Sequence, residues 1–289
     1  MKYDIGKTNR LGNRTSNQDR FAVLERPQAV LLILADGMGG HKGGELAANT
    51  FVLKMTEVFN DTALPIKDPH KFFTYAFEYA HLSVIETGKQ QEPPLVPRST
   101  GVACLVQNDT AWWAHAGDSR LYLIRENILF GRTRDHSIVE ELIKKGELTE
   151  KDRLNHPKSN QVTRCVGGVK KSIKPDYSPA TSLQPGDTLL LSTDGLWGSI
   201  SEDEIIKQFS THTNVDVALD RMSEHAENIS YPNSDNITAV ALRWISNENT
   251  VSVNRNEAQN TNNSDATQAD QVLDEIQQAL QKIEKDLKI

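Results

Sequence analysis

Five aspartates lie where apolar stretches of the chain begin or end, and they are the residues best suited to chemistry. Two of them follow an apolar run and precede a glycine, in Ala35-Asp36-Gly37 and Thr193-Asp194-Gly195. A single Asp-Gly pair predicts only a turn, and a single Asp before a strand or helix predicts only a cap. If the strand ends converge, however, the carboxylates repel one another unless protons or cations compensate. The full set is Asp19, Asp36, Asp118, Asp194 and Asp235.

The ligand chemistry of this set favours a hard divalent cation. Carboxylates without a cysteine or a histidine pair beside them are typical of Mg²⁺ or Mn²⁺ rather than zinc or copper. The EF-hand loop and the His-Glu-x-x-His pattern of zinc peptidases are both absent from the sequence. Two ions bridged by one aspartate could lower the pKa of a bound water and hold a phosphoryl group for in-line attack.

A glycine-rich stretch, Gly37-Met38-Gly39-Gly40-His41-Lys42-Gly43-Gly44, follows Asp36. It matches neither the P-loop pattern nor the G-x-G-x-x-G pattern of dinucleotide-binding folds, so a nucleotide site is disfavoured. Glycines beside Asp36 would let the backbone turn and let a carbonyl oxygen approach a cation closely, because no side chain obstructs it.

Composition excludes several classes of protein. The chain has 289 residues and a net charge of -7, which argues against a general nucleic-acid binder. Two cysteines, Cys104 and Cys165, are too few for a disulfide framework. The N-terminus lacks an apolar signal region, and no stretch reaches 18 apolar residues. We therefore expect a cytoplasmic protein with no nucleic-acid partner and no membrane span.

The chain divides into three parts. Residues 1–245 contain the apolar patterns of a folded domain, and residues 246–265 form an Asn-rich stretch typical of a flexible linker. Residues 266–289 carry apolar side chains at alternating steps of four and three, which predicts an amphipathic helix with heptad spacing. This helix would pack on its own domain, dock a partner or self-associate, and the sequence leaves these alternatives open.

Within residues 1–245, strand and helix patterns both occur without regular alternation, which predicts an α+β layered domain. Three consecutive strands, Thr100–Gln107, Ala111–Ala116 and Leu121–Arg125, are joined by short turns and are expected to form an antiparallel meander. The other predicted strands are Ala29–Ala35, Asp187–Ser192 and Ile237–Trp244. The predicted helices are Glu45–Phe59, Pro69–Thr87, Ile138–Lys145, Glu202–Phe209 and Asp216–Ile229.

Seven motif blocks contain these aspartates and follow one another across the predicted domain. In chain order they are Gly12-x-Arg14-x-x-Asn17-Gln18-Asp19, Ala35-Asp36-Gly37-Met38-Gly39-Gly40-His41, Gly117-Asp118-Ser119-Arg120, Thr133-x-Asp135-His136-Ser137, Thr163-Arg164-x-x-Gly167-Gly168, Ser192-Thr193-Asp194-Gly195-Leu196-Trp197 and Ser234-Asp235-Asn236-Ile237-Thr238. In this order and spacing the chain resembles the bacterial branch of the metal-dependent serine/threonine protein phosphatases of type 2C. One Asp-Gly block would be weak evidence, whereas seven ordered blocks are strong.

The resemblance implies an α-β-β-α sandwich of two antiparallel sheets flanked by helices, with metal ions at one end. Asp36 would bridge two Mn²⁺ or Mg²⁺ ions, and the carbonyl of Gly37 would bind one of them. Asp194 and Asp235 would bind the other ion, and Asp19 would contribute directly or through water. The reaction implied is hydrolysis of phosphoserine and phosphothreonine on proteins by water activated at the metal, opposing a Ser/Thr kinase.

Further residues gain roles only from this resemblance. Asp118 matches a position that helps to hold a third, weaker ion, and Arg14 matches the arginine that grips the substrate phosphate. Arg14 and Asp36 are thus the expected catalytic residues. Met38 stands where animal relatives carry a histidine proposed as the general acid, so water is left as the proton donor. The segment 137–161 matches a mobile flap that is expected to shape substrate choice.

Two other functional interpretations remain open. The first is a catalytically silent module that binds phosphoproteins, which predicts the loss of a metal-binding acid. Asp19, Asp36, Asp194 and Asp235 are all present, which disfavours it. The second is a scaffold or regulator that acts through the C-terminal helix.

Overall fold

The structure is a computed structural model that describes residues 1–39 and 41–246. The last strand ends at Ser246. The predicted helix 266–289, and the predicted linker beyond Ser246, lie outside the described residues.

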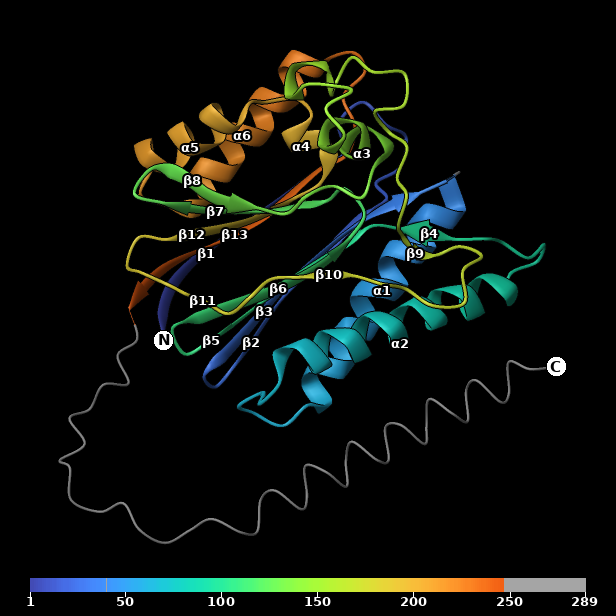
Figure 1. Cartoon of the computed structure of the whole chain (residues 1–289), viewed down its shortest axis with the longest axis horizontal. Coiled ribbons are helices and arrows are strands. Elements are labelled where there is room, and N and C mark those ends of the chain that lie inside the picture. Colours follow the sequence, from blue (N-terminus) through green and yellow to red (C-terminus); the bar gives the residue numbers. More distant parts are fainter. Residues whose placement is uncertain (40, 247–289) are drawn as a thin grey trace, which may run out of the picture. The chain divides into compact units, whose positions relative to one another are not determined.

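Two antiparallel sheets pack face to face, and helices cover their outer faces (Figure 1). The first sheet has the order β1 (Lys2–Arg10), β13 (Ile237–Ser246), β12 (Thr188–Ser192), β7 (Arg120–Arg125) and β8 (Ile128–Arg132). The second has the order β10 (Asp176–Tyr177), β6 (Thr110–Ala116), β5 (Gly101–Gln107), β3 (Ala29–Met38), β4 (Arg98–Ser99) and β9 (Val166–Gly167). In addition, β2 (Asp19–Arg26) pairs with β3, and β11 (Thr181–Ser182) pairs with β6. The predicted sandwich is confirmed.

Helices form the two outer layers. Two long ones, α1 (His41–Asp61) and α2 (Pro69–Lys89), pack on the second sheet, and α5 (Glu202–Thr211) and α6 (Val215–Ser230) cover the first (Figure 1). Shorter ones are α3 (Ile138–Lys144), α4 (Asp194–Trp197) and a 3-10 turn at Glu150–Asp152. Among the described residues, none of the helices combines the length and the apolar character needed to cross a membrane.

The apolar run of β3 is continuous because both faces of this strand are covered. Side chains of a strand point alternately to its two faces. Val30 and Leu32 enter the core between the sheets, where Val240 of the first sheet also lies. Leu31 and Ile33 enter the core beneath α1 and α2. β3 therefore runs through the middle of the domain and delivers Asp36 to its end.

The predicted three-strand meander is wrong in its third strand. β5 and β6 pair as expected, but β7 pairs with β12 and β8 in the other sheet. The chain changes sheets at residues 117–119, where Gly117 has a φ of +113°. A left-handed backbone of this kind suits glycine, because it has no Cβ to clash. The sequence shows a short turn here but not which sheet the next strand joins.

Candidate active site

Asp19 and Asp36 occupy directly opposite positions on the neighbouring strands β2 and β3. Asp19 is the first residue of β2 and is 1% exposed, while Asp36 lies near the end of β3 and is partly exposed. Burial, together with the charges of Asp194 and Asp235, raises the pKa of Asp19 to about 8. Burial raises the pKa of Asp36 well above its usual value, and the charge of Asp19 is the next largest cause. The two carboxyls thus crowd each other in a poorly solvated place.

The other three predicted acids lie at the same end of the sandwich. Asp118 lies in the loop between β6 and β7, Asp194 begins α4 directly after β12, and Asp235 precedes β13. All three, with Asp19, contribute to the raised pKa of Asp36. Burial, together with the charge of a neighbouring aspartate, raises the pKa of Asp118 to about 8 and that of Asp194 to about 6. The structure therefore brings together all five acids, which we call the acid cluster.

Gly37 and Gly44 allow α1 to approach the end of β3. A Cβ on Gly44 would lie 2.6 Å from the carbonyl oxygen of Gly37, and one on Gly37 would lie 2.2 Å from the carbonyl oxygen of Gly44. The sequence predicts a glycine loop followed by a helix from Glu45, but α1 begins at His41 and includes Gly43 and Gly44. These two glycines therefore permit close packing of the α1 backbone against the end of β3.

The donor set fits a hard divalent cation. Its members are carboxylate oxygens and a backbone carbonyl, which Mg²⁺ and Mn²⁺ prefer, and burial together with neighbouring carboxylates raises the pKa of Asp19, Asp36 and Asp118. Over residues 1–39 and 41–246, no three His, Cys, Asp or Glu side chains already stand in an arrangement that could hold a metal ion. Arg14 Nη2 lies 2.8 Å from Asp235 Oδ2, so one acid of the cluster is paired with a guanidinium.

Arg14 projects from the loop between β1 and β2, and Asn236 fixes that loop. The side-chain amide of Asn236 donates to the carbonyls of Leu11 (2.8 Å) and Ser16 (3.1 Å), and its oxygen accepts from the amide of Gln18 (2.9 Å). The Arg14 side chain itself is 55% exposed. The backbone of this loop is thus anchored, and the guanidinium lies exposed beside Asp235.

Thr193 performs a similar task for Asp19. Its hydroxyl donates to Asp19 Oδ2 at 2.9 Å and accepts from the amide of Thr238 at 3.1 Å. It thereby connects an acid of the second sheet to strands of the first. The motif blocks contain Thr193 and Asn236, but the sequence alone predicts no role for either residue, because only the folded chain shows which backbone groups they reach.

Residues 137–161, the predicted flap, form an excursion closed at its base. Ser137 pairs with Val162, and the amide of Ile138 donates to the carbonyl of Gln161. Within the flap, Ser137 caps α3 by accepting from the amide of Glu140. The amide of His136, directly before the flap, donates to the carbonyl of Gly117 at 2.9 Å, which places the base of the flap beside the loop that carries Asp118.

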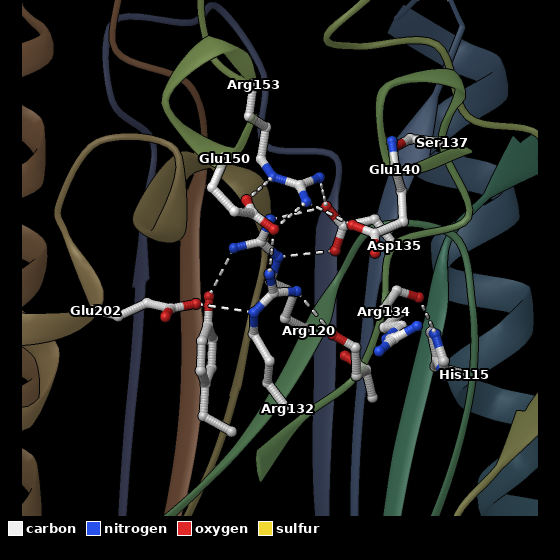
Figure 2. A network of polar contacts seen from close by, with 12 residues as sticks. His115, Arg120, Arg132, Arg134, Asp135, Ser137, Glu140, Glu150, Arg153 and Glu202 are labelled. Carbon is white, nitrogen blue, oxygen red and sulfur yellow. Dashed lines mark hydrogen bonds and ion pairs between the residues drawn. The ribbon is translucent and has the colours of Figure 1, made fainter. Parts of the chain in front are cut away.

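A buried ionic network ties the flap to the strands (Figure 2). Arg120 of β7 binds Asp135 with two parallel contacts of 2.8 and 2.7 Å, and Arg153 of the flap reaches the same carboxyl at 3.0 Å. Arg153 also donates to Glu140 and Glu150. The guanidinium of Arg120 lies 3.6 Å from the ring centroid of Trp197, the last residue of α4. The network therefore connects the flap to the helix that begins with Asp194.

A cleft of about 230 Å³ opens between the flap and the acid cluster. Arg153, Leu154 and Asn160 line it from the flap, and Asp118, Asp194 and Asp235 line it from the opposite side. A larger groove of about 500 Å³ is lined by residues of α5 and α6 and His212, and it includes no member of the acid cluster. Of these two, only the smaller cleft is lined by members of the acid cluster.

Comparison with known proteins agrees with this geometry. The protein phosphatase 2C family matches residues 6–240. The chain is 34% identical over 204 residues to protein phosphatase PhpP of Streptococcus pneumoniae, covering 70% of this chain and 80% of the relative. Among solved structures, the S. agalactiae serine/threonine phosphatase superposes with a TM-score of 0.76 at 28% identity, covering 85% of this chain and all of that one.

A further structure extends the comparison to metal. The catalytic domain of the serine/threonine protein phosphatase PstP, in complex with two manganese ions, superposes with a TM-score of 0.72 at 26% identity, covering 84% of this chain and 99% of that one. The sandwich and the acid cluster define the class of the α-β-β-α serine/threonine phosphatases. The chain belongs to the protein phosphatase 2C family, which confirms the resemblance seen in the motif blocks.

Proposed function

We propose that the chain hydrolyses phosphoserine and phosphothreonine on proteins, using two Mn²⁺ or Mg²⁺ ions and a third, weaker one. The observation that carries the proposal is the pairing of Asp19 with Asp36 at the end of β2 and β3, with three further acids around them. The manganese in PstP and the phosphatase names of the relatives support it. When bound, the ions would supply a water of lowered pKa and offset charge on the phosphoryl group.

The proposed metal ligands come from different parts of the fold and are assigned to different ions. Asp36 would bridge the two ions, and the Gly37 carbonyl would bind one of them. Asp194 and Asp235 would bind the other, with Asp19 contributing directly or through water. Asp118, in the loop between the sheets, would hold the third ion. Each carboxyl must be ionised to bind, so metal binding would release the protons that the raised pKa values retain.

Arg14 is the proposed phosphate-binding residue. Its guanidinium pairs with Asp235, but its exposure leaves it free to exchange that partner for a phosphate, whose geometry suits a guanidinium fork. Release of Asp235 would free this carboxyl for an ion at the same time. Met38 cannot donate a proton, so we assign protonation of the leaving alkoxide to water.

The proposed substrates are phosphorylated proteins, and the proposed partner is a cognate Ser/Thr kinase in the cytoplasm. The catalytic domain would be residues 1–245. The cleft beside Arg153 and Leu154 would accept the peptide around the phosphorylated residue, so the flap would act on substrate choice rather than on the chemistry.

Phosphate release from matched peptides tests the proposal. Phosphothreonine and phosphoserine peptides should be hydrolysed with millimolar Mn²⁺ but not with chelator, and the matched phosphotyrosine peptide should be a poorer substrate. Binding of the phosphothreonine peptide without turnover, in the presence of Mn²⁺, would instead support a silent binding module.

A further inference from the structure

Thr100 holds the peptide groups on both sides of Asp36. It lies between β4 and β5 and is fully buried. Its hydroxyl accepts from the Asp36 amide at 2.9 Å, and its own amide donates to the Asp36 carbonyl at 2.8 Å. The preceding Ser99 adds a hydroxyl bond of 2.8 Å to that carbonyl. The backbone of Asp36 is therefore fixed by neighbours outside β2, the strand that carries Asp19.

The Thr100 hydroxyl also reaches the loop that carries Asp118. Thr100 Oγ1 and Ser119 Oγ are 2.7 Å apart, and Ser119 is 2% exposed. Gly117 packs directly against Thr100, because a Cβ on Gly117 would lie 2.7 Å from the Thr100 Cβ and methyl carbon. A hydroxyl pair and a close packing contact thus join Asp36 of the second sheet to the crossing between the sheets.

The two hydroxyls play different parts in this buried hydrogen-bond network. Thr100 Oγ1 accepts the Asp36 amide hydrogen, and one hydroxyl hydrogen lies between Thr100 and Ser119. Removal of the Thr100 hydroxyl takes a partner from the buried Asp36 amide and from the buried Ser119 hydroxyl. This loss lowers the free energy of unfolding. Removal of the Ser119 hydroxyl leaves the Asp36 amide bond in place and breaks only the link between the two acids.

We propose that Thr100 and Ser119 are positioning residues that set the separation of Asp36 and Asp118, and thereby the affinity of the acid cluster for divalent ions. The inference rests on the proposed function for the identity of the ligand. Asp36 and Asp118 come from different chain segments. The Thr100 and Ser119 hydroxyls form a direct polar link between those segments. Groups that orient metal ligands commonly change metal affinity by about 10–100-fold when they are removed.

The test is calorimetric titration of the full chain with Mn²⁺. Thr100→Val keeps the shape of the side chain but removes the hydroxyl, whereas Thr100→Ser keeps the hydroxyl and removes the methyl. We expect Thr100→Val to weaken Mn²⁺ binding at least about tenfold and Thr100→Ser to stay within about threefold of the wild type. Thr87→Val removes a hydroxyl that bonds within α2, to the carbonyl of Ser83, and is the matched control with unchanged affinity.

Ser119→Ala keeps the proposal testable if Thr100→Val fails to fold. We expect it to weaken the last and weakest Mn²⁺ equivalent more than the first, because Asp118 is the acid that it releases. Hydrogen exchange of the Asp36 amide should accelerate in Thr100→Val and much less in Ser119→Ala. Equal losses in Thr100→Val and Thr100→Ser would mean simple packing and would overturn the inference, as would unchanged binding in Ser119→Ala. Failure of the wild type itself to bind Mn²⁺ would count against the proposed function instead.

Discussion

Asp19 and Asp36 lie opposite each other on adjacent antiparallel strands, where like charges destabilise a sheet. A neutral pair at these positions would favour the sheet, so the fold is weakened at the place where we propose that cations bind. Burial is the largest cause of the raised pKa of both residues; the charge of Asp19 adds to the shift of Asp36, and the charges of Asp194 and Asp235 add to that of Asp19.

The raised pKa values of the buried aspartates predict an unusual dependence of stability on pH. The pKa is raised to about 8 for Asp19 and Asp118 and to about 6 for Asp194. A raised folded-state pKa gives stability that is fully present below the unfolded value near 4 and is lost as pH rises through the folded value. We therefore expect the melting temperature of the metal-free protein to fall between about pH 5 and pH 8.

Mn²⁺ should remove this fall, because the ion takes the place of the protons. The measurement is thermal unfolding across that pH range with chelator and with Mn²⁺. Asp19→Asn should flatten the profile of the metal-free protein. A melting temperature that rises steadily from pH 5 to pH 8 in chelator would contradict the assigned crowding of the acids.

Adjacent glycines in α1 offer a matched test of the backbone packing beside Asp36. Gly44→Ala would place a Cβ 2.6 Å from the Gly37 carbonyl oxygen, whereas a Cβ on Gly43 would lie 3.9 Å from its nearest neighbour, the Cα of Pro97. We expect Gly44→Ala to lower the free energy of unfolding by about 1–3 kcal/mol and to weaken Mn²⁺ binding. Gly43→Ala should be neutral or stabilising by up to about 1 kcal/mol. Chemical denaturation of both variants checks this, and equal effects would refute the packing assignment.

Asn236 should matter to turnover although it is no proposed ligand. Asn236→Ala leaves the carbonyls of Leu11 and Ser16 and the amide of Gln18 without this partner. We expect a loss of about 1–3 kcal/mol in unfolding free energy and a fall in kcat/KM, because the loop that carries Arg14 loosens. Asn228→Ala on the exposed side of α6 is the control. Unchanged kcat/KM in Asn236→Ala would show that loop order is not limiting.

Arg153 should matter more for the turnover of phosphopeptides than for the turnover of small aryl phosphates. Arg153→Met keeps an apolar stem but removes the bonds to Asp135, Glu140 and Glu150. We expect a loss of about 1–3 kcal/mol in stability, faster proteolysis within residues 137–161, and a larger fall in turnover of phosphopeptides than of aryl phosphates. Lys151→Met in the exposed 3-10 turn is the control. Equal losses on both substrate classes would assign the network to the chemistry instead of to substrate choice.

The sequence reveals most of the site because its acids are local features of strand ends. Asp36 and Asp194 each stand between an apolar run and a glycine. This pattern can be recognised in the sequence without knowing which strands pair. The order of the motif blocks then identifies the sandwich. The acids lie at one common end of the two sheets because the strands are antiparallel. In such a pair, the end of one strand lies beside the start of the other.

The errors and omissions concern long-range contacts. β7 joins a different sheet from β6, because residues 117–119 cross between the layers, and no local pattern distinguishes this crossing from a hairpin turn. β1 is absent from the predicted strands, since its alternation of polar residues is weak and its order depends on pairing with β13. Thr100 is likewise an ordinary small residue in the sequence, and only folding places it between Asp36 and Ser119.

The most direct measurement of the central claim is Mn²⁺-dependent phosphate release from a phosphothreonine peptide by the wild type, Asp36→Asn and Asp203→Asn. Asp203 is an exposed acid on α5, outside the acid cluster. The account predicts that Asp36→Asn loses at least about a hundredfold in rate, since even groups that merely orient ligands cost about 10–100-fold, while Asp203→Asn matches the wild type. Mn²⁺-dependent turnover of a folded Asp36→Asn variant at the wild-type rate would contradict it.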